Sequence, residues 1–151
     1  QAIFIVVRGR PWNDIDALTA ENVVAVVARD WNGDQIPDLA YVGLSIQIRL
    51  GNGSNFFAAS STIALNIGTG LLSADLNGDT KADLVAVNAA GANVYLGNGA
   101  AGFGSALTFA AGSGPSAVAA GDWNGDGKDS PGVFRPSNGL IYLRNALTTG
   151  F

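Results

Sequence analysis

The pentapeptide Asp75-Leu-Asn-Gly-Asp79 lies near the middle of the chain and has two close copies. One copy, Asp30-Trp-Asn-Gly-Asp34, begins 45 residues earlier, and the other, Asp122-Trp-Asn-Gly-Asp126, begins 47 residues later. Repeats with a period of roughly 20–50 residues indicate a stack of similar units rather than one irregular core. The sequence therefore predicts three structural units, each built around one acidic loop.

Short apolar runs flank every acidic loop. They are β-branched or small and are bounded by glycine, which favours strands. The expected strands around the loops cover residues 23–28 and 38–42, 71–74 and 83–87, and 117–120 and 132–134. A third strand is expected at 45–50, 92–96 and 140–144, and a fourth within 55–65 and 103–109. We find no convincing helical period, so we expect little helix.

Four antiparallel strands per unit, at a period near 45 residues, match the blade of a β-propeller. We therefore expect an all-β fold with about three propeller-like blades per chain. The expected boundaries are 1–22 for an N-terminal strand and linker that completes a blade, 23–68 and 69–114 for two blades, and 115–151 for a third blade without its outer strand. The segments Leu50-Gly-Asn-Gly53 and Leu96-Gly-Asn-Gly99 predict tight turns with positive φ.

The composition restricts the function. The chain has 8 Lys+Arg against 12 Asp+Glu, which argues against a nucleic-acid partner, and it contains no apolar run of the ~18 residues that a membrane span needs. It has no Cys, Met or His, which removes imidazole and thiolate chemistry, so we expect no enzymatic activity. Because the chain begins with Gln1 and not with Met, we expect an exported protein, located outside the cell or at its surface.

The acidic residues point to a cation. Nine of the 12 lie in the three loops, and Ca²⁺ takes six to eight oxygen ligands at ~2.3–2.6 Å, which short Asp and Asn side chains at alternate positions can supply. We expect up to three Ca²⁺ ions per chain, bound at loop positions 1, 3, 5 and 9 and by the backbone carbonyl at position 7. The expected ligands are Asp30, Asn32, Asp34, Ile36 and Asp38; Asp75, Asn77, Asp79, Lys81 and Asp83; and Asp122, Asn124, Asp126, Lys128 and Asp129.

Two points about these loops stay open at the sequence level. Asp, Asn and Gly are also the commonest turn formers, so each loop alone fits a simple turn, although three in register favour the metal. In the third loop, Asp129 comes one position earlier than Asp38 and Asp83 do in theirs, so its last ligand is uncertain, with Asp129 favoured over Ser130. An EF-hand is disfavoured because no helices flank the loops.

The D-x-N-G-D-x-x-x-D-L loop, followed by a V-x-L-G-N-G-x-x-F-like stretch, resembles the FG-GAP/VCBS repeats of integrin α-subunit propellers and of many bacterial secreted proteins. The resemblance covers residues 20–151 with three matches. It implies that each acidic loop joins the first and second strands of a blade and binds Ca²⁺ there.

Three blades are fewer than the smallest closed propeller needs. We therefore expect a structural or adhesion module that self-assembles into a ring or filament, with the apolar run Ala2–Val7 adding as a strand to another copy. The alternatives are a fragment of a larger secreted propeller and a lectin, with a glycan or protein as ligand. The apolar residues Trp31, Leu76 and Trp123, all at loop position 2, favour packing between blades over sugar stacking.

Overall fold

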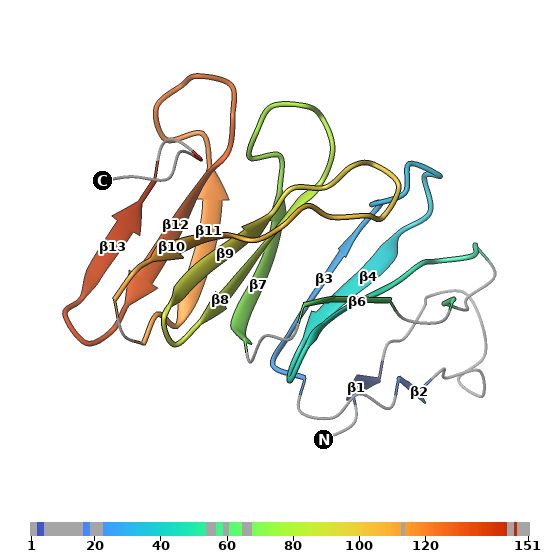
Figure 1. The fold of residues 1–151 in the computed structure, drawn as a ribbon, viewed down its shortest axis with the longest axis horizontal. Coiled ribbons are helices and arrows are strands. Elements are labelled where there is room, and N and C mark those ends of the chain that lie inside the picture. The colour runs from blue at the N-terminus through green and yellow to red at the C-terminus, as the bar shows by residue number, and fades with distance from the viewer. Residues whose placement is uncertain are drawn as a thin grey trace.

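The chain forms a row of antiparallel β-sheets (Figure 1). The computed structural model describes residues 3–4, 17–18, 23–53, 57–58, 61–64, 68–112, 114–144 and 147. These ranges contain strands and turns but no helix, and accordingly none that is long and apolar enough to cross a membrane. The all-β, propeller-like architecture predicted from the sequence is confirmed, and the sheets do not close into a ring.

Three sheets correspond to the three repeated units, and we call them blades 1, 2 and 3. Blade 1 contains β3 (Ala25–Arg29), β4 (Asp38–Val42), β5 (Ile46–Arg49) and β6 (Ser61–Ala64). Blade 2 contains β7 (Gly68–Ala74), β8 (Asp83–Asn88), β9 (Gly91–Tyr95) and β10 (Leu107–Ala110). Blade 3 contains β11 (Ala117–Gly121), β12 (Ser130–Arg135) and β13 (Leu140–Leu143), and the described residues hold no fourth strand in it.

A two-stranded sheet precedes blade 1. β1 (Ile3–Phe4) pairs antiparallel with β2 (Ala17–Leu18). Of the apolar run expected to add to another copy, only Ile3 and Phe4 lie among the described residues, and both are paired within the chain. The rest of that run lies outside the described ranges.

The first two strands of every blade share one register, which makes the three blades comparable position by position. Asp38 is paired with Arg29, Asp83 with Ala74, and Ser130 with Gly121. Opposed residues in an antiparallel pair point to the same face of the sheet. The register therefore sorts the residues of each blade into one face toward the preceding blade and one face toward the following blade. We call these the back and the front of a blade.

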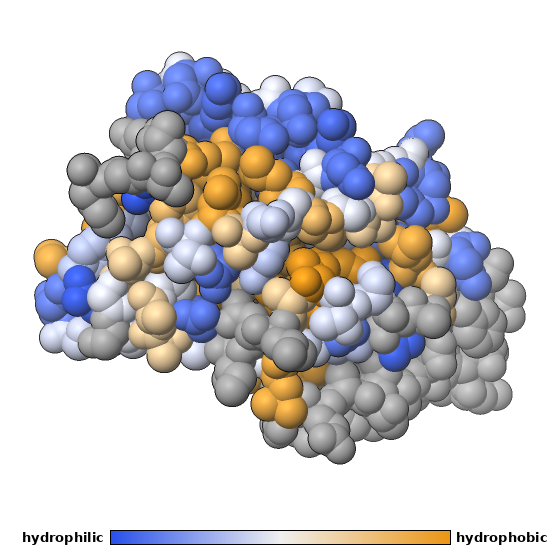
Figure 2. Space-filling view, in the orientation of Figure 1, coloured by the Kyte–Doolittle hydropathy of each residue, from blue (hydrophilic) through white to orange (hydrophobic). Residues whose placement is uncertain are grey.

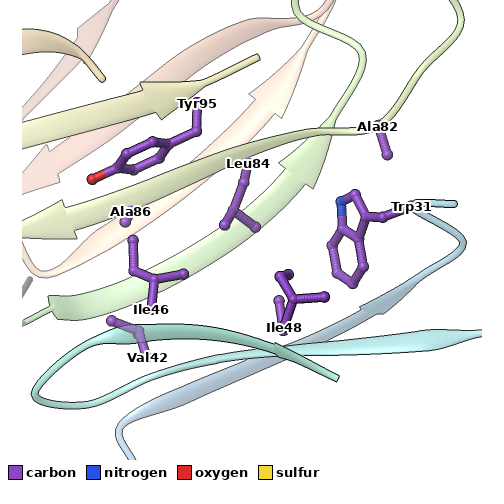
Figure 3. Close-up of a cluster of buried hydrophobic side chains, with 9 residues drawn as sticks. Trp31, Val42, Ile46, Ile48, Ala82, Leu84, Ala86 and Tyr95 are labelled. Carbon is purple, nitrogen blue, oxygen red and sulfur yellow. The ribbon is translucent and has the colours of Figure 1, made fainter. Parts of the chain in front are cut away.

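The apolar core lies between blades. The front of blade 1 contributes Trp31, Val42, Ile46 and Ile48, which pack against residues of blade 2 such as Leu84, Ala86 and Tyr95 (Figure 3). A second cluster joins blades 2 and 3 and includes Leu76, Val85, Val87, Val94, Phe109 and Val133. Alternate residues of β8 thus face opposite neighbours, which is why all four residues between its polar ends, 84–87, are apolar.

Glycine is required at the start of two turns. A Cβ on Gly51 would lie 2.4 Å from the carbonyl oxygen of Pro37, and one on Gly97 would lie 2.1 Å from that of Ala82. The predicted positive φ occurs two residues later, at Gly53 (72°) and Gly99 (77°). These glycines bring the turn after the third strand against the end of the acidic loop.

Candidate metal centre

The three acidic loops lie along one edge of the row of blades, each joining the first strand of a blade to the second (Figure 1). Figure 2 shows hydrophilic residues gathered along this edge. The strand pairing at the base of each loop fixes its two ends, so the loops hold equivalent positions in the three blades.

The first Asp of each loop organises the turn. The carboxylate of Asp30 accepts hydrogen bonds from the amides of Gly33 at 2.7 Å and Gln35 at 2.8 Å. Asp75 accepts the equivalent bonds from Gly78 and Thr80, and Asp122 those from Gly125 and Gly127. All three carboxylates therefore hold the loop backbone around themselves in the same way.

The amide donors at position 6 have an unusual backbone conformation. Gln35 has φ 66°, Thr80 has φ 68° and Gly127 has φ 84°. Only glycine adopts this region without steric cost, and for a β-branched residue such as threonine it is rare. The bond to the first Asp therefore stabilises a strained residue in the first two loops, whereas the third loop has glycine there.

The side chains at positions 3 and 5 face each other. In the first loop, Asn32 Nδ2 donates to Asp34 Oδ2 at 2.8 Å, and Asn124 donates to Asp126 in the same way at 2.9 Å. The position 5 carboxylate also accepts the position 7 amide, as in the 2.8 Å bond from Ile36 to Asp34. The amides of Lys81 and Lys128 donate the same bond to Asp79 and Asp126. The position 5 carboxylates therefore fix the backbone at position 7, whose carbonyls are the predicted backbone ligands.

The position 9 carboxylates have a different environment. Asp38 and Asp83 are buried. Asp83 accepts amide hydrogens from Leu76 at 2.9 Å and from Gly97 at 2.8 Å. Asp38 likewise accepts two amide hydrogens at 2.9 Å, from Trp31 and Gly51. Each of these carboxylates thus joins the start of its loop to the turn after the third strand. The sequence pattern identified the two Asp residues but not these amide partners.

The third loop lacks such a carboxylate. The register places Ser130, which is buried, where the other blades have Asp38 and Asp83. Asp129, favoured from the sequence as the last ligand, precedes that position, and its amide donates to the carbonyl of Asp75 in the loop of blade 2 at 3.1 Å. The one-residue shift seen in the sequence therefore coincides with a change of residue type at position 9.

The electrostatics differ between exposed and buried positions. The amides of Gly127, Gly125 and neighbouring residues hold the pKa of Asp122 below its ordinary value. Burial raises the pKa of Asp83 in spite of its two amide bonds, and the negative charges of Asp79 and Asp75 raise it further. In the second loop, three carboxylates thus lie close enough to repel one another, and a bound cation would relieve that repulsion.

The donor chemistry of the loops fits a hard cation. Every side-chain donor is a carboxylate or amide oxygen, which Ca²⁺ prefers, and a carboxylate has about four lone-pair sites, so those that accept two amide hydrogens retain acceptor capacity. Among the described residues, however, no group of three or more acidic side chains has the geometry of a metal site. Binding an ion would therefore require movement of side chains that now bond to loop amides.

Comparisons with known proteins agree with the repeat and the fold. Residues 75–129 match the family model of the FG-GAP-like repeat, which covers the second and third acidic loops and the strands between them. No curated protein matches the chain in sequence. Among solved structures, the chain is similar to the Tc holotoxin pore of Photorhabdus luminescens, with a TM-score of 0.57 and 20% identity. That match covers 82% of this chain and 6% of the toxin chain, and at this identity it shows the fold alone.

The fold of this chain is thus all-β with propeller-like blades, and its residues 75–129 match an FG-GAP-like repeat. The chain spans only 6% of the length of the toxin chain it resembles, so the activity of that larger protein does not transfer to it.

Proposed function

We propose that this chain is a non-catalytic extracellular module whose blades are stabilised by Ca²⁺ and whose open blades join further blades. The observation that carries the proposal is the threefold recurrence of one loop geometry, in which loop amides donate the same hydrogen bonds to the carboxylates at positions 1 and 5 in every copy. Simple turns do not need three acidic or amide side chains at alternate positions, whereas a calcium loop does.

The loops also connect neighbouring blades, which supports a structural role. The carbonyl of Trp31 accepts a 2.8 Å hydrogen bond from Ala101 of blade 2, and the carbonyl of Asp75 accepts one from Asp129 of blade 3. The stem of Lys128 lies across the loop of blade 2, because a Cβ on Gly78 would be 3.1 Å from its Cγ. An ion that ordered one loop would therefore also order its contact with the next blade.

In this proposal the residues at positions 1, 3 and 5, with the carbonyls at position 7, hold the ion. Asp38 and Asp83 complete the first two sites, and the bound ion supplies positive charge among their carboxylates. The third loop has fewer acidic groups at the equivalent positions, because Ser130 stands at position 9, so it should bind Ca²⁺ most weakly.

Calorimetric titration of chelator-stripped protein with Ca²⁺ tests the proposal. We expect two tighter sites and one weaker site, and we expect D30N, D75N and D122N each to remove one of them. Mg²⁺ is the matched control ion, because its strict octahedral geometry suits these loops less well. Absence of Ca²⁺ binding in the intact protein would refute the calcium role.

A lectin is the second candidate, and the exposure of Trp123, at 48%, favours it. Trp31 is unavailable to a sugar because it is buried between blades. The pocket between blades 2 and 3, of about 80 Å³, is mainly apolar, and its aromatic rings are covered by guanidinium groups, with Arg144 lying 4.2 Å from the ring centre of Phe109. A glycan array with Trp123→Ala as the control variant decides this point, since loss of binding in the variant would support the lectin.

A further inference from the structure

The front of blade 3 is an apolar sheet face that repeats, position by position, the face that blade 1 buries. Trp123 is equivalent to Trp31, Phe134 to Val42, Ile141 to Ile46 and Leu143 to Ile48. The four residues of blade 1 are buried, whereas Ile141 is 67% exposed and Trp123, Phe134 and Leu143 are also exposed. The difference in exposure follows from the neighbour, because blade 2 covers the front of blade 1 and no described residue covers that of blade 3.

Trp123 is already held in place on this face. Its Nε1 donates to the carbonyl oxygen of Ser130 at 2.8 Å. A Cβ on Gly121 would lie 3.3 Å from the indole, and one on Gly132 would lie 2.9 Å from Leu143, so the two glycines leave room for these side chains against the sheet. The face is therefore arranged before any partner binds, which lowers the cost of association.

Blade 1 offers the matching back. In blades 2 and 3, one residue on the back of the first strand packs into the apolar cluster shared with the preceding blade. These residues are Leu71 in blade 2 and Val118 in blade 3. The register makes Val26 of β3 their equivalent, and Val26 is 45% exposed. Leu39 and Tyr41, farther across the same face, are buried, so the accessible part of this back is β3 itself.

The first strand of each following blade lies against the preceding blade. β7 contacts β3 and β4 of blade 1, and β11 contacts β7 and β8 of blade 2. At the second of these interfaces, a Cβ on Gly70 would lie 3.6 Å from Cγ1 of Val118. Ala117 of blade 3 is equivalent to Gly70, and Val26 of β3 is equivalent to Val118. If β3 of a second copy packed on blade 3 as β11 packs on blade 2, its Val26 would lie against Ala117.

We propose that the front of blade 3, centred on Trp123 and Ile141, binds the back of β3 in blade 1 of a second copy of this chain. Of the three blade fronts, that of blade 3 is the exposed one, and of the three equivalent back residues Val26, Leu71 and Val118, Val26 is the exposed one. They lie at opposite ends of the row of blades (Figure 1), so one copy cannot join them to each other. The contact is head-to-tail, and it produces a closed ring or a longer series of copies.

This inference rests on the part of the proposed function in which open blades join further blades, and it makes no use of calcium. Cysteine cross-linking tests it directly, because the natural chain contains no Cys. Proteins carrying Val26→Cys and Ala117→Cys are prepared separately, mixed and mildly oxidised, in Ca²⁺ and in EGTA. A disulfide needs Cβ atoms about 3.5–4.5 Å apart, so the mixture should form a covalent dimer.

The matched control replaces Val26→Cys with Leu44→Cys, an exposed residue in the turn between β4 and β5 that lies outside the proposed contact. We expect at least tenfold more cross-linked dimer from the Val26 mixture than from this control. Equal yields would overturn the proposal, and so would efficient cross-linking of the Ala117→Cys protein with itself, since that would mean that two blade 3 fronts pair.

A second variant guards against a folding artefact. Ile141→Lys places a charge on a side chain that is already exposed in one copy, so the chain should still fold, with unchanged Ca²⁺ titration and circular dichroism. Sedimentation should shift from an assembled species to the monomer in this variant. A wild-type protein that sediments as a monomer at all concentrations would overturn the second-copy contact while leaving the calcium proposal intact.

Discussion

Replacing Asp83 by Asn separates the structural role of the position 9 carboxylate from any role in holding a metal. The substitution keeps the shape of the side chain but replaces one acceptor oxygen by an NH₂ group. One of the two amide donors, Leu76 or Gly97, then faces another donor inside the protein. Because Asp83 is fully buried, water cannot replace the lost bond.

The magnitude follows from these contacts. A hydrogen bond to a charged group contributes about 1.5–3 kcal/mol, and an unsatisfied buried donor costs about 1–3 kcal/mol. Burial disfavours the ionised form of Asp83 and raises its pKa, so removing the charge offsets part of this loss. We therefore expect Asp83→Asn to lower the free energy of unfolding by about 3 kcal/mol, which corresponds to roughly 10 °C in melting temperature for a chain of this size.

The assay is thermal unfolding by circular dichroism in EGTA, with Asp79→Asn as the matched control. Asn at position 79 keeps the oxygen that accepts the Lys81 amide, and the site is exposed, so this control should melt close to the wild type without metal. If Asp83→Asn were also to melt like the wild type in EGTA, and to differ only when Ca²⁺ is present, the two amide bonds would not have the structural importance that we assign to them.

Three further predictions concern strain, packing and pH. Thr80→Gly should stabilise the protein by about 1 kcal/mol, because glycine adopts the positive φ of 68° without strain, and an unchanged or lower melting temperature would contradict this. Trp31→Ala should cost about 3–5 kcal/mol in urea unfolding, whereas Trp123→Ala at the equivalent but exposed position should cost less than half as much under conditions where the protein is monomeric. Amide bonds lower the pKa of Asp122, so its stabilisation is complete above the unfolded-state value of about 3.9 and is lost as the pH falls through the lower folded-state value. In EGTA, Asp122→Asn should therefore flatten the dependence of melting temperature on pH between about pH 5 and pH 2, and an unchanged slope would count against the bonds from Gly125 and Gly127.

The sequence predicted the blades well because each element has a local signal. The alternating apolar run at 46–49 became β5, and the Asn-Gly turns adopted the expected positive φ at Gly53 and Gly99. The packing of Trp31 between blades was also predictable, since an apolar residue recurs at that loop position.

Other features depended on contacts between distant segments. The bonds of Asp38 and Asp83 to Gly51 and Gly97 join residues more than ten positions apart, and no local pattern marks them. The place of Ser130 followed from the register of β11 and β12, which the sequence spacing alone left open. The exposure of Trp123 depends on whether another blade covers its front, and the residue type at that loop position does not encode this, since Trp31 and Leu76 are buried there.

Stabilisation of the blades by Ca²⁺ is tested by thermal unfolding of the chelator-stripped protein before and after Ca²⁺ is restored. A ligand that binds only the folded state at about 100 times its dissociation constant adds about 2.7 kcal/mol per site. The melting temperature should therefore rise with Ca²⁺ by roughly 10 °C for each site filled to that level, and fall again on addition of EGTA. An identical melt in both conditions, with elemental analysis confirming that the stripped protein is metal-free, would contradict this stabilisation.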